Sequence, residues 1–123
     1  MAGTLTEVTD ADFDSVVLKC TRPVLVHFWA PWSGPCRQIT SSLQAIAAEH
    51  GDRIEIVKLN TDENPTITSR CGIISIPTMN IYQGGEVAKT ITGARPKYAI
   101  ENDLHRHVAV VGAECLPPRG SGG

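Results

Sequence analysis

A strand pattern meets a helix pattern in the segment Val24-Leu25-Val26-His27-Phe28-Trp29-Ala30-Pro31-Trp32-Ser33-Gly34-Pro35-Cys36. The first six residues are almost continuously apolar and rich in β-branched side chains, which is typical of a central strand buried on both faces. Apolar residues then recur at helical spacing, and they predict an amphipathic helix from about Gly34 to His50, ended by Gly51. Cys36 lies in the first turn of this helix, where free backbone amides favour a thiolate.

Strand and helix patterns alternate along the rest of the chain, which indicates an α/β fold. Before the segment we expect an edge strand at 4–8 and a helix that starts at Thr9, with Asp12 as its capping partner, and ends near Cys20. After it we expect a strand at 53–60, a short helix at 65–71, strands at 77–83 and 86–92 around the hairpin Gly84-Gly85, and a last helix from Pro96 that carries Ile100, Leu104, Val108 and Val111. This predicts one domain, residues 1–111, followed by a disordered Gly/Pro/Ser-rich tail at 112–123.

Composition excludes several functional classes. The 123 residues are 41% hydrophobic and carry a formal net charge of -2, without a basic stripe, so we expect no nucleic-acid partner. No apolar run approaches the ~20 residues of a membrane helix, and the acidic N-terminal region does not resemble a signal peptide. We therefore expect a cytoplasmic monomer with free thiols, because the four cysteines lack the paired spacing of a zinc site. His105 and His107 do not face together on a helix, so we expect no metal and no cofactor.

The chain resembles thioredoxin from Gly3 to about Val108. The landmarks that carry the resemblance are Phe28-Trp29-Ala30, Trp32-x-Gly34-Pro35-Cys36, Lys58-Leu59-Asn60, Ile76-Pro77-Thr78, the Gly84-Gly85 hairpin and Gly93. The resemblance implies a central mixed sheet flanked by helices on both faces, with a cis peptide bond before Pro77. It also implies protein thiol–disulfide exchange fed by a thioredoxin reductase, with Lys58 near the motif. The groove that holds an extended peptide of the client would be formed by Trp29, Trp32, Ile76, Pro77 and Gly93.

The sequence departs from this family at the motif itself. Thioredoxins use Cys-Gly-Pro-Cys, in which the first cysteine attacks a client disulfide and the second resolves the mixed disulfide. Here Ser33 occupies the first position, and a hydroxyl forms no disulfide, so the dithiol cycle is predicted to be lost or severely weakened. Serine is also a favoured helix N-cap, which offers Ser33 a structural role. His27 stands where the family usually places a buried aspartate, and Thr40 stands where many relatives carry a proline.

Three interpretations stay open on the sequence. The chain is a degenerate oxidoreductase with monothiol chemistry at Cys36, helped by His27 as a base; or a chaperone-like module that binds clients without turnover; or a variant of an active enzyme in which Ser33 replaces the attacking cysteine. Cys36 is equally compatible with inert packing. Cys71 is expected near the surface that carries Pro77, with a quiet helix residue as the alternative, whereas Cys20 and Cys115 are interpreted as incidental.

Overall fold

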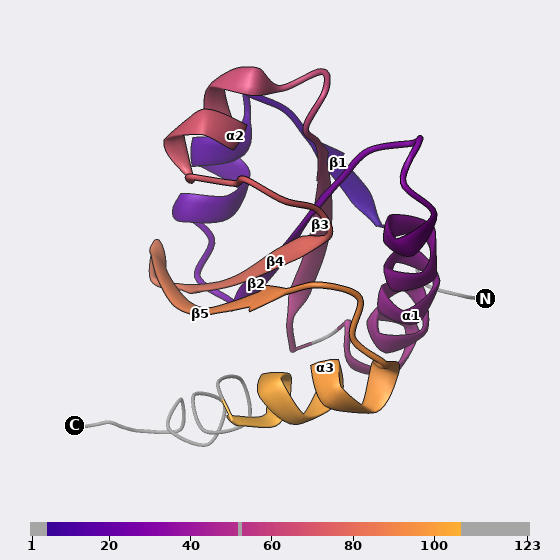
Figure 1. Cartoon of the computed structure of the whole chain (residues 1–123). Helices are drawn as coiled ribbons and strands as arrows, with labels where there is room; N and C mark the ends of the chain where they lie inside the picture. Colours follow the sequence, from indigo (N-terminus) through magenta and orange to yellow (C-terminus); the bar gives the residue numbers. More distant parts are fainter. Residues whose placement is uncertain (1–4, 52, 107–123) are drawn as a thin grey trace.

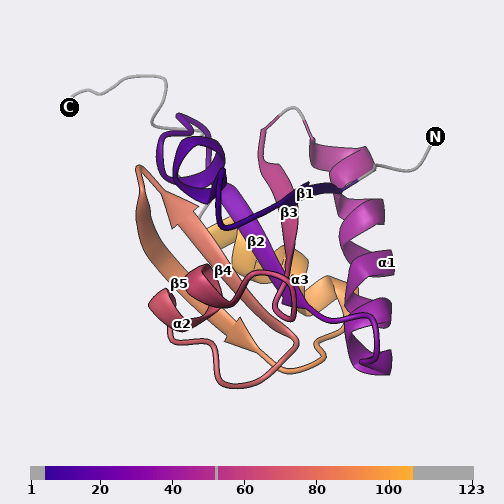
Figure 2. The ribbon, with the colours of Figure 1, turned by 90° about the horizontal axis from the view of Figure 1, so that it is seen from above.

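Strand β2 (Val24–Trp29) lies at the centre of a mixed sheet in the computed structural model, which describes residues 5–51 and 53–106. It pairs parallel with β3 (Glu55–Asn60) on one side and antiparallel with β4 (Thr78–Gln83) on the other. The edges are β1 (Thr6–Val8) and β5 (Glu86–Thr92), so the strand order is β1-β3-β2-β4-β5, which can be followed in Figure 2. The prediction of a central strand at 24–29 is confirmed.

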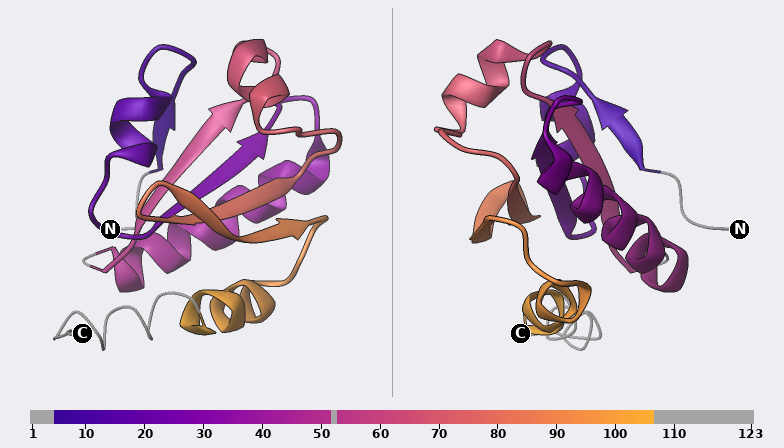
Figure 3. Two further views of the ribbon diagram at one scale, coloured as in Figure 1. Left: turned by 90° about the vertical axis from the view of Figure 1, so that its left-hand side faces the viewer. Right: turned by 45° about the vertical axis from the view of Figure 1, so that its right-hand side comes forward.

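Helices cover both faces of the sheet (Figures 1 and 3). The long helix α1 (Gly34–His50) and helix α3 (Lys97–Leu104) lie on one face, and the short helices η1 (Asp14–Leu18) and α2 (Pro65–Arg70) lie on the other. Two apolar cores result. The core under α1 and α3 contains Leu25, Ile39, Leu43, Ile46, Met79 and Ile100, and the core under η1 and α2 contains Phe13, Val17, Val26, Phe28, Leu59 and Ile67. The expected mixed sheet with helices on both faces is confirmed.

The structure corrects several predicted details. The first helix is only the π-helical turn Asp14–Leu18, closed by a hydrogen bond from Lys19 N to Asp14 O at 3.2 Å, although Asp12 does accept a hydrogen bond from Thr9 N at 2.6 Å as expected. Helix α1 does end at His50, but Gly51 keeps a right-handed φ of -64°. A glycine is needed there because a Cβ atom would lie 2.6 Å from the carbonyl oxygen of Ala47.

Smaller shifts affect the ends of other elements. The edge strand β1 starts at Thr6, and β3 starts at Glu55, two residues later than expected. The hairpin is confirmed, with positive φ angles of 61° and 84° at Gly84 and Gly85. Val108, Val111, His107, Cys115 and the predicted tail at 112–123 lie outside the described residues, as does the expected domain limit at residue 111.

The peptide bond between Ile76 and Pro77 is cis. It lies directly before β4, and the antiparallel register pairs Thr78 with Phe28, so this bond is next to the end of β2. Among the residues that the structure describes, no helix has the length and apolar character that crossing a membrane requires.

Helix α2 is capped from a distant part of the chain. Its own N-cap residue, Asn64, makes no capping hydrogen bond with its side chain. Instead the carboxylate of Asp10 accepts hydrogen bonds from the backbone N–H groups of Thr66 and Ile67 at 3.2 and 2.8 Å. The N–H of Asp10 in turn donates to the Asn64 side chain at 2.8 Å, so one residue pins the loop after β1 to the start of α2.

Asp10→Ala is therefore expected to lower the free energy of unfolding by about 1 kcal/mol, the usual value of a helix N-cap. Urea unfolding followed by circular dichroism measures it. Glu7→Ala, an exposed acidic residue on β1, is the matched control and should change the stability little. Equal stability of the two variants would show that the α2 amides do not depend on Asp10.

Candidate functional site

The motif lies at the edge of the sheet where two parallel strands end. β2 ends at Trp29 and β3 ends at Asn60, and the N–H of Thr61 donates to the carbonyl oxygen of Trp29 at 2.9 Å. Loops that follow the carboxyl ends of parallel strands gather at one edge, where α/β proteins place their sites. The loop from β2 to α1 is thereby brought beside the loop that follows β3.

Ser33 acts as the N-cap of α1. Its backbone is extended, with φ -94° and ψ 111°, and its Oγ accepts a hydrogen bond from the N–H of Cys36 at 3.4 Å. The side chain is buried, and Pro35 in the first turn has no N–H that needs a partner. The hydroxyl oxygen therefore satisfies a free amide of the helix, as the capping interpretation expects.

Cys36 is fully buried, with 0% of its surface exposed. It shares the inner stripe of α1 with Ile39, Leu43 and Ile46, all of which pack toward the sheet. A client disulfide cannot reach this sulfur without movement of the motif.

His27 lies beneath the first turn of α1 and is also fully buried. Its Nε2 lies 3.1 Å from Thr40 Oγ1 and 3.3 Å from the carbonyl oxygen of Cys36. The Thr40 hydroxyl donates its single proton to the same Cys36 oxygen at 3.0 Å, so its contact with the ring requires Nε2–H to be the donor. This network assigns the Nε2–H tautomer to His27.

The ring of His27 is neutral in the folded protein. The pKa of His27 is lowered from the ordinary value of 6.5 to about 4, and burial is the main cause. The hydrogen bond to the Cys36 carbonyl raises this pKa by a smaller amount, and the nearby charge of Lys58 lowers it slightly further. The other ring nitrogen, Nδ1, is buried and has no hydrogen-bond partner among the described residues. The structure therefore disfavours the thiolate–imidazolium pair that the sequence left open, and it places Nε2–H against the backbone of Cys36.

Lys58 and Trp29 form a cation–π pair. The Nζ atom of Lys58 lies 4.7 Å from the centre of the Trp29 ring, and the two residues extend from neighbouring positions on β3 and β2. Trp29 is half-buried. The pair packs at the border of the core.

Trp32 is exposed, with 69% of its surface accessible, yet its orientation is fixed. Its indole N–H donates to the carboxylate of Asp62 at 2.8 Å. Asp62 is held in turn by Asn60, whose side-chain oxygen accepts from the N–H groups of Asp62 and Glu63 at 2.9 and 3.2 Å. The sequence reasoning missed Asp62 and used Asn60 only as a landmark, although Asn at the end of a strand is a turn signal that pointed to this loop.

The other expected groove residues come together at the start of β4. The N–H of Gly93 donates to the carbonyl oxygen of Pro77 at 2.9 Å. Pro77 is buried, whereas Gly93 is exposed and Ile76 is half-buried. Ile74, three residues before Pro77, has 97% of its surface exposed and was not singled out from the sequence.

Among the residues that the structure describes, the other cysteines do not add a second thiol to the motif. Cys20, Cys36 and Cys71 are free, and Cys20 and Cys71 are half-buried against the core under η1 and α2. The sulfur of Cys71 lies 3.5 Å from the hydroxyl of Tyr82. This supports the interpretation of Cys71 as a quiet helix residue. Within residues 5–51 and 53–106, the side chains that gather as metal ligands are Glu49, His50 and Glu101, at the far end of α1.

Comparisons with known proteins agree with this geometry. The sequence model of the family described as Thioredoxin matches residues 4–106. A thioredoxin from Streptomyces clavuligerus is 62% identical over 100 residues, which cover 81% of this chain and 92% of that protein. Thioredoxin 1 from Synechococcus elongatus is 48% identical over 101 residues, which cover 82% of this chain and 94% of the relative. The M-type chloroplastic thioredoxin of Chlamydomonas reinhardtii is also 48% identical, over 82% of this chain and 72% of its own length. With its fold, its motif loop and these relatives, the chain belongs to the thioredoxin family.

Proposed function

We propose that this protein binds client proteins at the surface around its motif and does not complete a dithiol redox cycle. Thioredoxins are disulfide oxidoreductases that act on protein disulfides and are commonly reduced by thioredoxin reductase. The function shared by the family is therefore exchange between protein thiols and disulfides. For this chain we propose docking of client proteins without catalytic turnover, because the residues for docking are present and the attacking sulfur is not.

The observations that carry the proposal are the capping hydrogen bond of Ser33 and the complete burial of Cys36. The Oγ of Ser33 is buried and accepts the N–H of Cys36, so it caps α1. An alcohol cannot form the mixed disulfide through which exchange proceeds. The one sulfur of the motif, on Cys36, has 0% of its surface exposed. A client disulfide therefore meets no accessible thiol at this site.

The docking surface consists of Trp32, Ile74, Ile76, Pro77 and Gly93. Trp32 and Ile74 expose large apolar side chains, and the Asp62 carboxylate holds the Trp32 ring in one orientation. A preorganised aromatic ring loses little conformational entropy on binding, which is why tryptophan often dominates interfaces. Backbone groups next to the cis peptide bond offer hydrogen bonds to an extended peptide.

Residual monothiol chemistry at Cys36 is the second candidate. It is favoured by the position of this cysteine in the first turn of α1, where the free backbone amides of the helix lie. It requires the motif to open, since the sulfur is buried, and it has no imidazolium to help because the His27 pKa is lowered to about 4. Slow alkylation of Cys36 by iodoacetamide in the folded protein would assign this cysteine to packing.

Trp32→Ala is expected to weaken the binding of an extended, thiol-free polypeptide about 30-fold, because an interface tryptophan commonly contributes about 2 kcal/mol. The probe is reduced and carboxymethylated insulin B chain, titrated into the full protein by calorimetry. Such a probe has no disulfide or thiol, so it reports docking alone.

Tyr98→Ala is the matched control for this titration. Tyr98 exposes 67% of its surface, nearly the same fraction as Trp32, but it lies on α3. It should leave the affinity unchanged. Equal weakening by both variants, or no measurable binding by the unmodified chain, would contradict a docking surface at the motif.

A further inference from the structure

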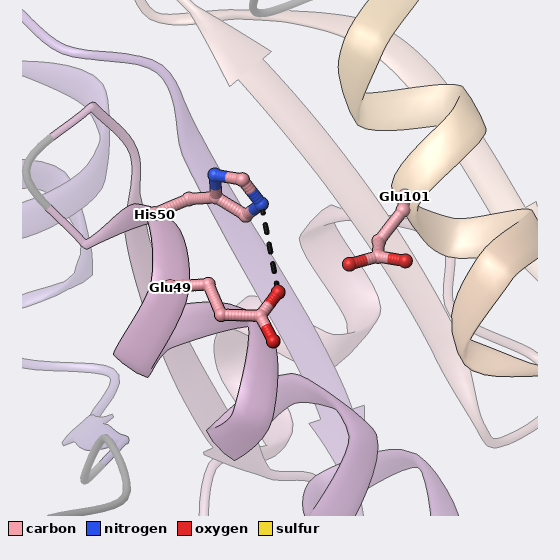
Figure 4. A group of neighbouring side chains, drawn as sticks. All are labelled: Glu49, His50 and Glu101. Carbon is pink, nitrogen blue, oxygen red and sulfur yellow. Dashed lines mark ion pairs between the residues drawn. The ribbon is translucent and has the colours of Figure 1, made fainter.

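Three potential metal ligands meet where the end of α1 lies against α3. The ligand atoms of Glu49, His50 and Glu101 all lie within 4.8 Å of one another. Figure 4 shows the three side chains pointing toward one another, two from the last turn of α1 and one from α3. His50 Nε2 is 3.8 Å from the Glu49 carboxylate. Side chains from two separate helices therefore converge on one small volume.

The imidazole of His105 lies beside this group of three and offers a fourth donor. It follows Glu101 by four residues, so both project from the same face of the helical segment. Its imidazole ring lies 6.4 Å from that of His50, measured between ring centres. Two imidazoles bound to one Zn²⁺, with Zn–N distances of about 2.0–2.1 Å, have centres about 5 to 6 Å apart. Small side-chain rotations would bring both rings to one ion.

The electrostatics of the cluster favour a cation. Lys97 places its ammonium 3.4 Å from a carboxylate oxygen of Glu49 and 3.4 Å from one of Glu101. A positive charge already bridges the two helices, and it is carried by a half-buried lysine side chain. A divalent ion in its place would gain the same two carboxylates and, in addition, the two imidazoles.

We propose that Glu49, His50, Glu101 and His105 bind Zn²⁺ and thereby join α1 to α3. Two imidazole nitrogens and two carboxylates form a donor set that Zn²⁺ accepts in tetrahedral geometry. The sequence expectation of no metal compared His105 only with His107, whereas the partner of His105 is on the other helix. At 1.5 Å per residue, this end of α1 lies about 20 Å from Cys36, so the site is independent of the motif.

Calorimetric titration of the full, reduced protein with Zn²⁺ tests the site. The unmodified chain is expected to bind one more equivalent of Zn²⁺ than His50→Ala does, or to bind it at least tenfold more tightly. Loss of a residue that only supports a metal ligand lowers the affinity about 10- to 100-fold, and loss of the ligand itself should lower it at least as much. His105→Ala should have the same effect. All variants keep the four cysteines, so binding to thiols cancels in the comparison.

Two further variants sharpen the test. Lys97→Met removes the competing ammonium and should tighten binding, and Glu63→Gln, an exposed acidic residue outside the cluster, should leave it unchanged. Zn²⁺ should also raise the Tm of the unmodified chain but not that of His50→Ala, because an ion that binds only the folded state stabilises it. Identical titrations of the unmodified chain, His50→Ala and His105→Ala would overturn the proposal.

Discussion

Ser33→Cys is expected to convert this protein into an active disulfide reductase. The introduced thiol would stand at the N-terminus of α1, where its thiolate is stabilised, and could attack a client disulfide to form a mixed disulfide. The thiol of Cys36 would then attack that bond, release the second client thiol and leave an intramolecular disulfide. We expect the rate of insulin reduction, with dithiothreitol as the electron donor, to rise by about 10³-fold or more over the unmodified chain, the scale of effect seen when a catalytic nucleophile is removed.

Matched variants show whether the rate of insulin reduction depends on a thiol at position 33 or on any added thiol. Ser41→Cys adds an exposed thiol on the same helix and should leave the rate at background. Cys36→Ala, combined with Ser33→Cys, should stop turnover and trap the mixed disulfide. A second arm with NADPH and thioredoxin reductase tests recognition by the reductase separately from the chemistry. Rapid insulin reduction by the unmodified chain would refute the claim that Ser33 blocks the cycle.

Stability is expected to fall in mild acid because of His27. The folded protein keeps this ring neutral down to a pKa of about 4, whereas the unfolded chain protonates it near 6.5. Between these values the unfolded state binds more protons, so the free energy of unfolding decreases as the pH falls through this window. The pKa difference of about two and a half units corresponds to about 3.5 kcal/mol in total, at about 1.4 kcal/mol per unit. About 3 kcal/mol of this is lost by pH 4, where the folded ring is itself half protonated.

His27→Gln is the variant that isolates this effect. Its amide nitrogen can reach the position of Nε2 and donate to Thr40 and the Cys36 carbonyl, but it does not titrate. Urea unfolding at several pH values between 7 and 4.5 should show a markedly smaller pH slope for the variant than for the unmodified chain. Every other side chain is the same in both proteins, so its contribution cancels in the comparison. Parallel stability curves would mean that His27 gains its proton as easily in the folded protein as in the unfolded one.

Much of the fold could be predicted from the periodicity of apolar residues and from the residues typical of turns. The continuous apolar run at 24–29 can be satisfied only by burial on both faces, and β2 does lie between β3 and β4. Apolar residues at i, i+3 and i+7 placed the inner stripe of α1, and Gly84-Gly85 placed the hairpin. These signals are local, because a strand or helix must alternate its side chains with the period of its own backbone.

Contacts between residues that are far apart along the chain could not be predicted from the sequence. The cap of α2 comes from Asp10, and the acceptor for the Trp32 indole comes from Asp62 on another loop. Local pattern also overstated the first helix, because only five residues of it form a helical turn. Nothing in the spacing of these residues along the chain encodes their distance in space.

The sequence by itself determined the family, the central strand and the absence of a sulfur at position 33, since residue type alone decides whether a disulfide can form. Only the tertiary structure decided the rest of the chemistry. It buries Cys36, turns Ser33 into a helix cap, lowers the His27 pKa and brings His105 to His50. Solvation and through-space distance control these properties, and both are set by how the elements pack rather than by their order along the chain.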